Sequence, residues 1–434
     1  MVAVWEPVLC LEVMTSKYDE RVLEIGAQAR NAARALARNT TAEKTAALSA
    51  AADQIERSSE RILTANEADM KSATAAGLSS AMLDRLRLDS ARVKALAKSV
   101  RQVGALPDPV GSVIREWDRG DGLAFTKVRV PIGVIGIIYE SRPNVTSDAA
   151  SLCLKTGNAV VLRGGSESLH SNLAIAEALR DGCRQAGVDP DAIQIIDLTD
   201  RGAVRAIAEM DQYIDLIIPR GGKELIDTIT KFARMPVIKH YDGVCHVYVD
   251  RAADLAMAES ILINAKCQRP SVCNAVETLL VHQDVADAFL RKCGRSLQER
   301  RVELRGDERT RAILGPDIAL ATEQDWRTEY LDLILSIRVV DSTEQAVQHI
   351  ETYGSHHSDA IVTEDEATAQ AFLREVDSSA VFWNASTRFN DGGEFGFGAE
   401  IGISTNRLHA RGPMALEELT TYKYVVRGKG HVRS

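Results

Sequence analysis

The sequence lacks a basic excess and a long apolar run, and each absence excludes a class of protein. The formal net charge is −9 at pH 7, which argues against a nucleic-acid binder, because neutralising phosphates requires a basic face. It argues equally against a protein dedicated to anionic membranes. No apolar run reaches the ~18 residues typical of a membrane-spanning helix. We expect a soluble protein.

The N-terminus also lacks the features of a secretory signal. Its first residues, MVAVWEPVLCLEV, are apolar, but Glu6, Pro7 and Glu12 interrupt them and no basic segment precedes them. Residues 1–13 are therefore predicted to be a disordered extension, with Met14 as a plausible true start. A cytoplasmic location follows from this interpretation.

Paired cysteines are missing as well. The 7 cysteines form no C-x-x-C pair, which makes a structural zinc site improbable, and we predict no metal. An odd number of cysteines scattered through apolar contexts is typical of reduced thiols in a reducing compartment.

The patterns that are present predict an α/β protein of more than one domain. Residues 19 to about 105 are alanine-rich and charged with helical spacing. Continuous apolar runs then alternate with helical patterns, which indicates a doubly wound parallel sheet. These predicted strands span 133–138, 159–162, 193–196 and 215–218.

A second α/β unit is predicted after Pro236, and period-two patterns flank the two units. The predicted strands of the second unit span 247–249, 278–281, 336–340, 360–362 and 380–383. Residues 123–130 and 419–426 alternate apolar and polar, which is typical of exposed antiparallel strands. They either pair as a projecting arm or form a local hairpin.

Two strand ends carry a cation followed by two glycines. The first is Arg163, Gly164 and Gly165, and the second is Arg220, Gly221 and Gly222. Ligands of open α/β sheets bind at the carboxyl edge of the strands, and glycines allow close backbone approach to a phosphate. Neither stretch matches G-x-G-x-x-G or a P-loop, so ordinary glycine turns are the alternative to a nucleotide site.

The stretch 264–280 places Cys267 and Cys273 on either side of a Gln-Arg-Pro turn, just before an apolar run that predicts a strand. A cysteine in such a loop can expose its sulfur where backbone N–H groups stabilise a thiolate and a later oxyanion. The alternative is that Cys273 is a small buried hydrophobic residue.

Several motifs resemble a known family. The segments PIGVIG (131–136) and KTGNAVVLRGG (155–165), followed by the cysteine loop, resemble the aldehyde dehydrogenase superfamily. The segments YESRPNVT (139–146) and QRPSVCN (268–274) are similar to its γ-glutamyl phosphate reductase family. Residues 240–250, 349–359 and 398–405 carry the same resemblance, which extends from about residue 18 to 427.

The resemblance implies a domain organisation, a reaction and partners. It implies an NADPH-binding domain (14–118 and 132–238), a catalytic domain (239–405) and an oligomerisation arm (119–131 and 406–428). The implied reaction is NADPH-dependent reduction of L-glutamyl 5-phosphate to L-glutamate 5-semialdehyde, the second step of proline synthesis. The nucleophile would be Cys273, acting through a thioester. A homodimer or higher oligomer is implied, and a transient contact with glutamate 5-kinase stays open.

Specific side chains suit the anions of this reaction. The oxyanion needs donors, for which we expect the Cys273 N–H and the side chain of Asn144 or Ser141. Asn144 has a second interpretation as a turn-capping residue after a proline. Arg142 and Arg269 are the candidates for the acyl phosphate or carboxylate, because arginine binds such anions in bidentate fashion.

Arginines and glycines at the strand ends suit the cofactor. Arg163 is expected to meet the 2′-phosphate of NADPH, the common basis of that selectivity. Arg220 and Lys223 are expected at the pyrophosphate or the substrate phosphate, with a surface charge as the alternative for each.

One absence bears on the reaction type. Hydrolytic members of the superfamily carry a glutamate before Gly-Gly that activates water, whereas residues 240–245 read HYDGVC. Water should therefore be a poor acyl acceptor and phosphate should replace it. The rival functions are a CoA-acylating aldehyde dehydrogenase and a non-catalytic nucleotide-binding protein that kept the fold.

Overall fold

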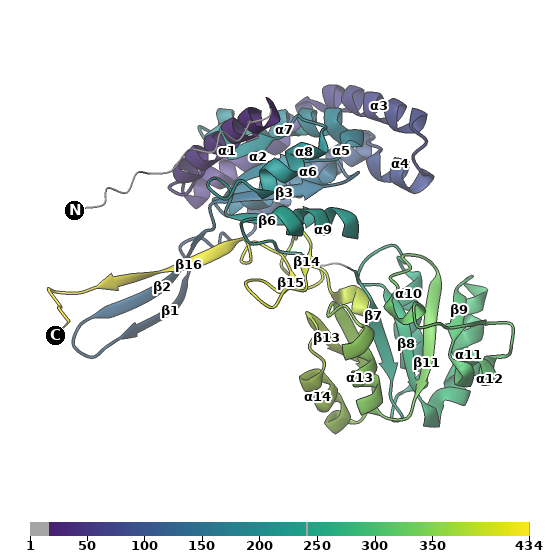
Figure 1. Cartoon of the computed structure of the whole chain (residues 1–434). Coiled ribbons are helices and arrows are strands. Elements are labelled where there is room, and N and C mark those ends of the chain that lie inside the picture. Colours follow the sequence, from purple (N-terminus) through teal and green to yellow (C-terminus); the bar gives the residue numbers. More distant parts are fainter. Residues whose placement is uncertain (1–16, 240–241, 434) are drawn as a thin grey trace, which may run out of the picture. The chain divides into compact units, whose positions relative to one another are not determined.

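The computed structural model describes residues 17–239 and 242–433, and the chain divides into two compact units (Figure 1). Unit 1 comprises residues up to Val237 and from Thr420 onward, and unit 2 comprises Ile238–Leu419. The predicted extension 1–13 and the alternative start at Met14 lie outside the described residues. Within the described ranges, no helix is long and apolar enough to cross a membrane.

Unit 1 is built from helices packed on both faces of a parallel sheet, as the apolar runs predicted. Residues of α1, α8 and α9 share one apolar cluster with the sheet, and α6 and α7 lie with α2 and α5 in the same unit (Figure 1). The helices are α1 (Lys17–Leu36), α2 (Thr41–Arg57), α3 (Ser59–Ala75), α4 (Ser80–Leu86), α5 (Ser90–Ala105), α6 (Asn144–Lys155), α7 (Leu169–Gln185), α8 (Arg201–Ala208) and α9 (Lys223–Phe232).

The sheet of unit 1 has the strand order β5-β4-β3-β6, and every neighbouring pair is parallel. Its strands are β3 (Val134–Tyr139), β4 (Ala159–Arg163), β5 (Ile193–Ile195) and β6 (Leu216–Arg220). Because the chain continues from β3 to one side and returns to the other at β6, the carboxyl ends of β3 and β6 form a topological switch point. Ligands of doubly wound sheets bind at such a point.

An antiparallel arm completes unit 1. It has the order β1-β2-β16, with β1 (Val113–Asp118), β2 (Ala124–Pro131) and β16 (Thr420–Arg427). The pairing of β2 with β16 follows the predicted alternation. Two boundaries differ from the predicted 119–131 and 406–428. The arm's first strand already begins at Val113, where all positions are exposed and no alternation arises, and residues 406–419 belong to unit 2.

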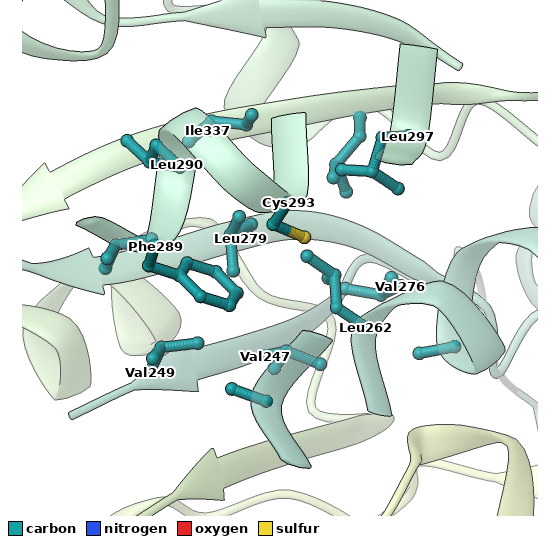
Figure 2. Packing of buried hydrophobic residues seen from close by; sticks show 14 of the residues in the cluster. Val247, Val249, Leu262, Val276, Leu279, Phe289, Leu290, Cys293, Leu297 and Ile337 are labelled. Carbon is teal, nitrogen blue, oxygen red and sulfur yellow. The ribbon is translucent and has the colours of Figure 1, made fainter. Parts of the chain in front are cut away.

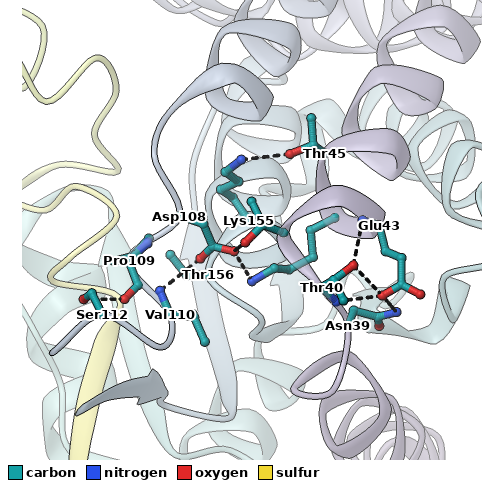
Figure 3. Close-up of polar contacts among 12 residues, drawn as sticks. Asn39, Thr40, Glu43, Thr45, Asp108, Pro109, Val110, Ser112, Lys155 and Thr156 are labelled. Carbon is teal, nitrogen blue, oxygen red and sulfur yellow. Dashed lines mark hydrogen bonds and ion pairs between the residues drawn. The ribbon is translucent and has the colours of Figure 1, made fainter. Parts of the chain in front are cut away.

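Buried polar contacts fix the segment that leads into the arm (Figure 3). Asp108 lies 2.6 Å from the ammonium of Lys44, with both side chains almost completely buried. Lys155 donates to the hydroxyl of Thr45 at 3.0 Å and to the carbonyl of Gly104 at 2.7 Å. These contacts join the arm's root to α2, α5 and α6.

Unit 2 contains a larger parallel sheet with the order β10-β9-β11-β8-β7-β12-β13. Its strands are β7 (Cys245–Val249), β8 (Val276–His282), β9 (Glu303–Gly306), β10 (Ala319–Leu320), β11 (Ile334–Val340), β12 (Ser358–Val362) and β13 (Ala380–Trp383). A short antiparallel pair, β14 (Ile403–Ser404) and β15 (Gly412–Pro413), lies outside this sheet. The helices are α10 (Leu255–Cys267), α11 (Gln283–Glu299), α12 (Glu308–Leu314), α13 (Thr343–Tyr353) and α14 (Glu366–Glu375).

The sheet of unit 2 buries both faces because successive residues of a strand point to opposite sides. Val247 and Val249 pack with Leu262 and Phe289 from α10 and α11 (Figure 2). Tyr248 points the other way and packs with residues of α13 and α14. The observed α/β fold, with two parallel sheets and an antiparallel arm, confirms the predicted fold class.

Candidate active site

The cysteine loop connects the end of α10 to the start of β8. Cys267 is the last residue of α10 and packs against the apolar cluster of unit 2, where burial raises the pKa of its thiol. Cys273 is half-buried and lies just before Val276, the first residue of β8. Both cysteines are therefore partly accessible, and Cys267 packs against the core whereas Cys273 lies in the loop.

Three consecutive carbonyls of this loop accept hydrogen bonds. The carbonyl of Val272 accepts from the Ala275 N–H at 3.0 Å. The carbonyl of Cys273 accepts a hydrogen bond from the thiol of Cys245 at 3.1 Å. The carbonyl of Asn274 accepts one from the hydroxyl of Thr387 at 2.7 Å. Among the described residues, the N–H groups of Cys273 and Asn274 have no acceptor. Such donors can stabilise an oxyanion that forms beside the sulfur.

Gly243 allows the backbone before β7 to approach the loop closely. A Cβ at this position would lie 2.0 Å from the carbonyl oxygen of Cys273, so a side chain has no room there. The Gly243 N–H donates to the carboxylate of Glu329, a contact that lowers the pKa of Glu329, although burial raises it overall. Only glycine satisfies the backbone spacing that brings these segments together.

Arg388, which was not among the predicted site residues, lies beside the cysteine loop. It belongs to a short 3₁₀ turn, Thr387–Phe389, and donates from Nε to Gln268 at 2.8 Å and from Nη1 to the Asn274 side chain. Burial lowers the pKa of Arg388, the neighbouring charge of Arg269 lowers it further, and the charge of Cys273 acts in the opposite direction. Arg388 is therefore within electrostatic range of both Arg269 and the Cys273 thiol.

No local pattern in the sequence pointed to Arg388, since 114 positions separate it from Asn274. The preceding β13 was predicted, but the turn after a strand can hold any polar residue. The neighbouring Thr387 donates to the Asn274 carbonyl and so anchors the turn to the loop. Threonine is too common in turns for its presence to have predicted this contact.

A buried ion pair supports the loop from the sheet side. Lys266 and Glu277 lie 2.6 Å apart, and both side chains are completely buried. Glu277 also accepts the Leu331 N–H at 3.3 Å. Burial raises the pKa of Glu277 to about 7, while Lys266 acts in the opposite direction. The partners of this carboxylate are structural, which agrees with a role in orienting the loop.

The predicted cofactor residues of unit 1 gather at one sheet edge. In the register of β3 with its neighbours, Ile138 pairs with Arg163 and Tyr139 pairs with Arg220. Arg163 is 8% exposed and donates to the Thr199 carbonyl at 3.3 Å. The two arginines thus flank the carboxyl end of β3, as the sequence predicted for the strands that carry them.

Three of the glycines after these arginines lie close to polar side chains of the same unit. A Cβ on Gly164 would lie 2.1 Å from the Asn172 side chain, and one on Gly165 would lie 2.2 Å from the Glu167 carboxylate. A Cβ on Gly221 would lie 2.6 Å from the Glu140 carboxylate.

Gly222 lies at the start of α9, where the sequence predicted a phosphate. Its N–H already donates to Glu140 at 3.0 Å. The first donor of this helix is thus occupied by an internal carboxylate.

Three further predicted residues, Ser141, Arg142 and Asn144, also lie in unit 1. Ser141, at φ 41°, donates from its N–H and its hydroxyl to Glu167 at 2.7 and 2.6 Å. Asn144 is exposed at the start of α6 and donates to Asp148 at 3.0 Å, and Arg142 is exposed. Because Cys273 and Arg269 belong to unit 2, the roles of these three residues toward the thiol stay predictions.

A metal centre finds no support among the described residues, where no cluster of His, Cys, Asp and Glu could hold an ion. His357 and Asp359, which lie in one of the motifs, make structural hydrogen bonds. The Asp359 carboxylate accepts hydrogen bonds from His246, from the ring Nδ1 at 2.8 Å and from the backbone N–H at 2.9 Å.

Comparison with known proteins gives consistent results. Residues 10–323 match the aldehyde dehydrogenase family. The chain is 57% identical over 408 residues to a gamma-glutamyl phosphate reductase from Moorella thermoacetica, covering 94% of this chain and 97% of that protein. It is 53% identical over 414 residues to one from Geotalea daltonii, covering 95% and 99%. A crystal structure of gamma-glutamyl phosphate reductase from Thermotoga maritima has a TM-score of 0.94 at 47% identity, covering 95% of this chain and 100% of that one.

Proposed function

The chain belongs to the aldehyde dehydrogenase family, and we propose that it is a γ-glutamyl phosphate reductase that uses NADPH. It reduces L-glutamyl 5-phosphate to L-glutamate 5-semialdehyde and phosphate, the second step of L-proline synthesis. The observation that carries the proposal is identity of 53–57% to relatives of that name over nearly the full length of both chains.

The chemistry assigns Cys273 as the nucleophile. Its thiolate attacks the carbonyl carbon of the acyl phosphate, and phosphate departs as a good leaving group, which leaves a thioester on the sulfur. A nicotinamide cofactor, when bound, would supply the hydride that reduces this thioester. The resulting thiohemiacetal releases the aldehyde and regenerates the thiolate.

The charge that develops on the carbonyl oxygen needs preorganised donors. The Cys273 N–H, which has no acceptor among the described residues, suits this role, and so does the N–H of Asn274. The side-chain amide of Asn144 is a further candidate, whereas the single hydroxyl proton of Ser141 is already donated to Glu167. Losing one such donor typically costs about 10²–10³-fold in rate.

The substrate carries anionic groups at both ends, a phosphate and an α-carboxylate. Arg269 is exposed in the cysteine loop and Arg388 is half-buried, and the charge of Arg269 acts on Arg388. Two like charges held together without an anion repel each other, so an anionic substrate would relieve their repulsion. Arg142 is the proposed third contact.

The family works with a nicotinamide cofactor, and we assign NADPH to the edge of the sheet in unit 1. The switch point at β3 and β6 is where a dinucleotide binds in a doubly wound sheet. Arg163 would select the 2′-phosphate, and Arg220 would meet the pyrophosphate. Gly164, Gly165, Gly221 and Gly222 would keep the backbone of this edge accessible.

Two further proposals concern assembly and location. The arm exposes large apolar side chains, which supports a homodimer or higher homo-oligomer. A cytoplasmic location agrees with cysteines that are all free among the described residues.

The reverse reaction tests the function. Glutamate semialdehyde, phosphate and NADP⁺ are mixed with the wild type and with Cys273→Ala, and NADPH formation is followed by absorbance. Phosphate-dependent formation that is lost in the variant supports both the reaction and the nucleophile. Formation without phosphate would indicate a hydrolytic enzyme, and formation that requires CoA in place of phosphate would indicate the acylating rival.

A further inference from the structure

The middle of the three anchored carbonyls is held by a thiol that the reaction does not use. Cys245, the first residue of β7, is completely buried, and its Sγ lies 3.1 Å from the carbonyl oxygen of Cys273. A carbonyl and the following N–H belong to one rigid peptide plane. The thiol therefore orients the peptide that joins Cys273 to Asn274, including the N–H of Asn274.

A buried ring of contacts leads from Cys245 back to the loop. The Sγ of Cys245 lies 3.7 Å from His357 Nδ1, which lies 2.8 Å from the Ser358 hydroxyl. Asn390 Nδ2 donates to the same hydroxyl at 2.8 Å, and Asn274 Nδ2 donates to the Asn390 carbonyl at 2.9 Å. All five residues are buried, so the ring fixes the loop on both sides of the peptide that follows the sulfur.

The protonation states of Cys245 and His357 agree with a hydrogen bond that the Cys245 thiol donates to the Cys273 carbonyl. Burial raises the pKa of Cys245 well above its ordinary value, so its sulfur carries the proton that it donates. Burial lowers the pKa of His357 to about 4, so the imidazole beside the thiol is neutral at neutral pH and draws no proton from it.

We infer that Cys245 is a positioning residue for the nucleophile, because its S–H holds the Cys273–Asn274 peptide in the orientation that presents the loop's N–H groups to an oxyanion. The inference rests on the proposed function in taking Cys273 as the attacking sulfur. It does not depend on which acyl group the sulfur receives.

The test compares three variants of the full-length protein. Cys245→Ala removes the donor, and Cys245→Ser restores an O–H donor at the same position. Cys293→Ala is the matched control, because Cys293 is a buried thiol in the apolar cluster of the same unit (Figure 2) and lies outside the ring. Thermal unfolding of all three variants measures how much stability the protein loses when a buried thiol is removed.

Two readouts separate positioning from general packing. For the reverse reaction, Cys245→Ala should lower kcat by about 10- to 100-fold, in line with the effect of a small misplacement of catalytic groups, with KM for phosphate changed by less than about twofold. Cys245→Ser should recover most of this loss. The alkylation of Cys273 by iodoacetamide, followed by peptide mass spectrometry, should slow several-fold in Cys245→Ala and stay unchanged in Cys293→Ala.

Two results would overturn the inference. One is a Cys245→Ala protein whose kcat and Cys273 alkylation rate both stay within about twofold of the wild type. The other is an equal loss in Cys245→Ala and Cys293→Ala, which would reduce the effect to packing. A wild type without phosphate-dependent activity would contradict the proposed function, and the alkylation rates would still decide the role of Cys245.

Discussion

At Gly243 the active-site loop depends on the absence of a single carbon atom. An added Cβ would lie 2.0 Å from the Cys273 carbonyl oxygen and 2.7 Å from its Cα, and these are backbone atoms that cannot rotate away. The same carbonyl accepts the Cys245 thiol. A side chain here would therefore displace the segment that carries the nucleophile.

We predict that Gly243→Ala lowers kcat of the reverse reaction by about 100-fold or more, because a displacement of about 1 Å at a reacting group costs that much. The control is Gly104→Ala, where a Cβ meets only the Leu48 side chain at 3.3 Å and activity should stay near that of the wild type. Normal kcat in Gly243→Ala would mean that the loop tolerates the displacement.

Arg388 gives a prediction about substrate binding. Arg388→Met should raise KM for phosphate about tenfold or more, since a hydrogen bond to a charged group contributes about 1.5–3 kcal/mol. Arg388→Lys should recover only part of the affinity, because an ammonium cannot form the planar fork of a guanidinium. Arg374→Met, at an exposed position of α14, serves as the control.

The contacts of Arg388 with the cysteine loop suggest an alternative role, in which the residue positions the loop and does not bind phosphate. Its Nε and Nη1 donate to Gln268 and Asn274, so the residue can also act as an anchor. A fall in kcat with unchanged KM for phosphate would assign it to positioning and remove it from the substrate contacts.

These residues mark the limit of prediction from sequence. Cys273 could be predicted because its signal is local, a turn with proline before an apolar run. Cys245 and Arg388 reach the loop from other strands and turns through the packing of the sheet. Nothing in their immediate neighbours distinguishes them from an ordinary buried thiol or surface arginine.

At the scale of elements, apolar runs predicted the buried strands well. The predicted 159–162 and 215–218 correspond to β4 (Ala159–Arg163) and β6 (Leu216–Arg220), where both faces are buried and consecutive apolar residues are required. β1 was missed because all its positions are exposed. β9 was missed because only four residues, ELRG, form it.

The buried ion pair between Lys266 of α10 and Glu277 of β8 gives a prediction about stability. Lys266→Met and Glu277→Leu should each destabilise unit 2 by about 3–5 kcal/mol, because each leaves a buried charge without its partner. The double variant should recover most of this loss, since apolar groups of similar volume replace a buried pair well. Urea unfolding followed by the fluorescence of Trp326, which is largely buried in unit 2, measures the three values.

The exposed pair Asp287–Arg291 on α11, at 2.7 Å, is the control for this cycle. Breaking it should have little effect, because solvent-exposed ion pairs contribute little. Additive losses in the Lys266 and Glu277 double variant would show that the two buried charges do not stabilise each other.

At the scale of the whole molecule, the arm of unit 1 exposes large apolar side chains to solvent. One face gathers aromatic side chains from all three strands. Trp117 stacks on Phe125 with centroids 5.2 Å apart and meets Tyr424 edge-on at 6.0 Å. Exposed fractions of 37% for Trp117, 49% for Tyr422 and 55% for Tyr424 leave a contiguous apolar surface of the kind that marks a protein interface.

We predict that this face joins copies of the chain. The double variant Trp117→Lys, Tyr424→Lys should shift the mass in solution toward that of a single chain, 47.3 kDa, because burying two ammonium groups in an apolar contact costs more than the contact gains. Light scattering after size-exclusion chromatography measures the mass at several concentrations. Leu320→Lys is the control, since Leu320 is also an exposed apolar residue (48%) but lies on β10. An unchanged mass in the arm variant, with the fold intact by circular dichroism, would place the assembly contact elsewhere on the chain.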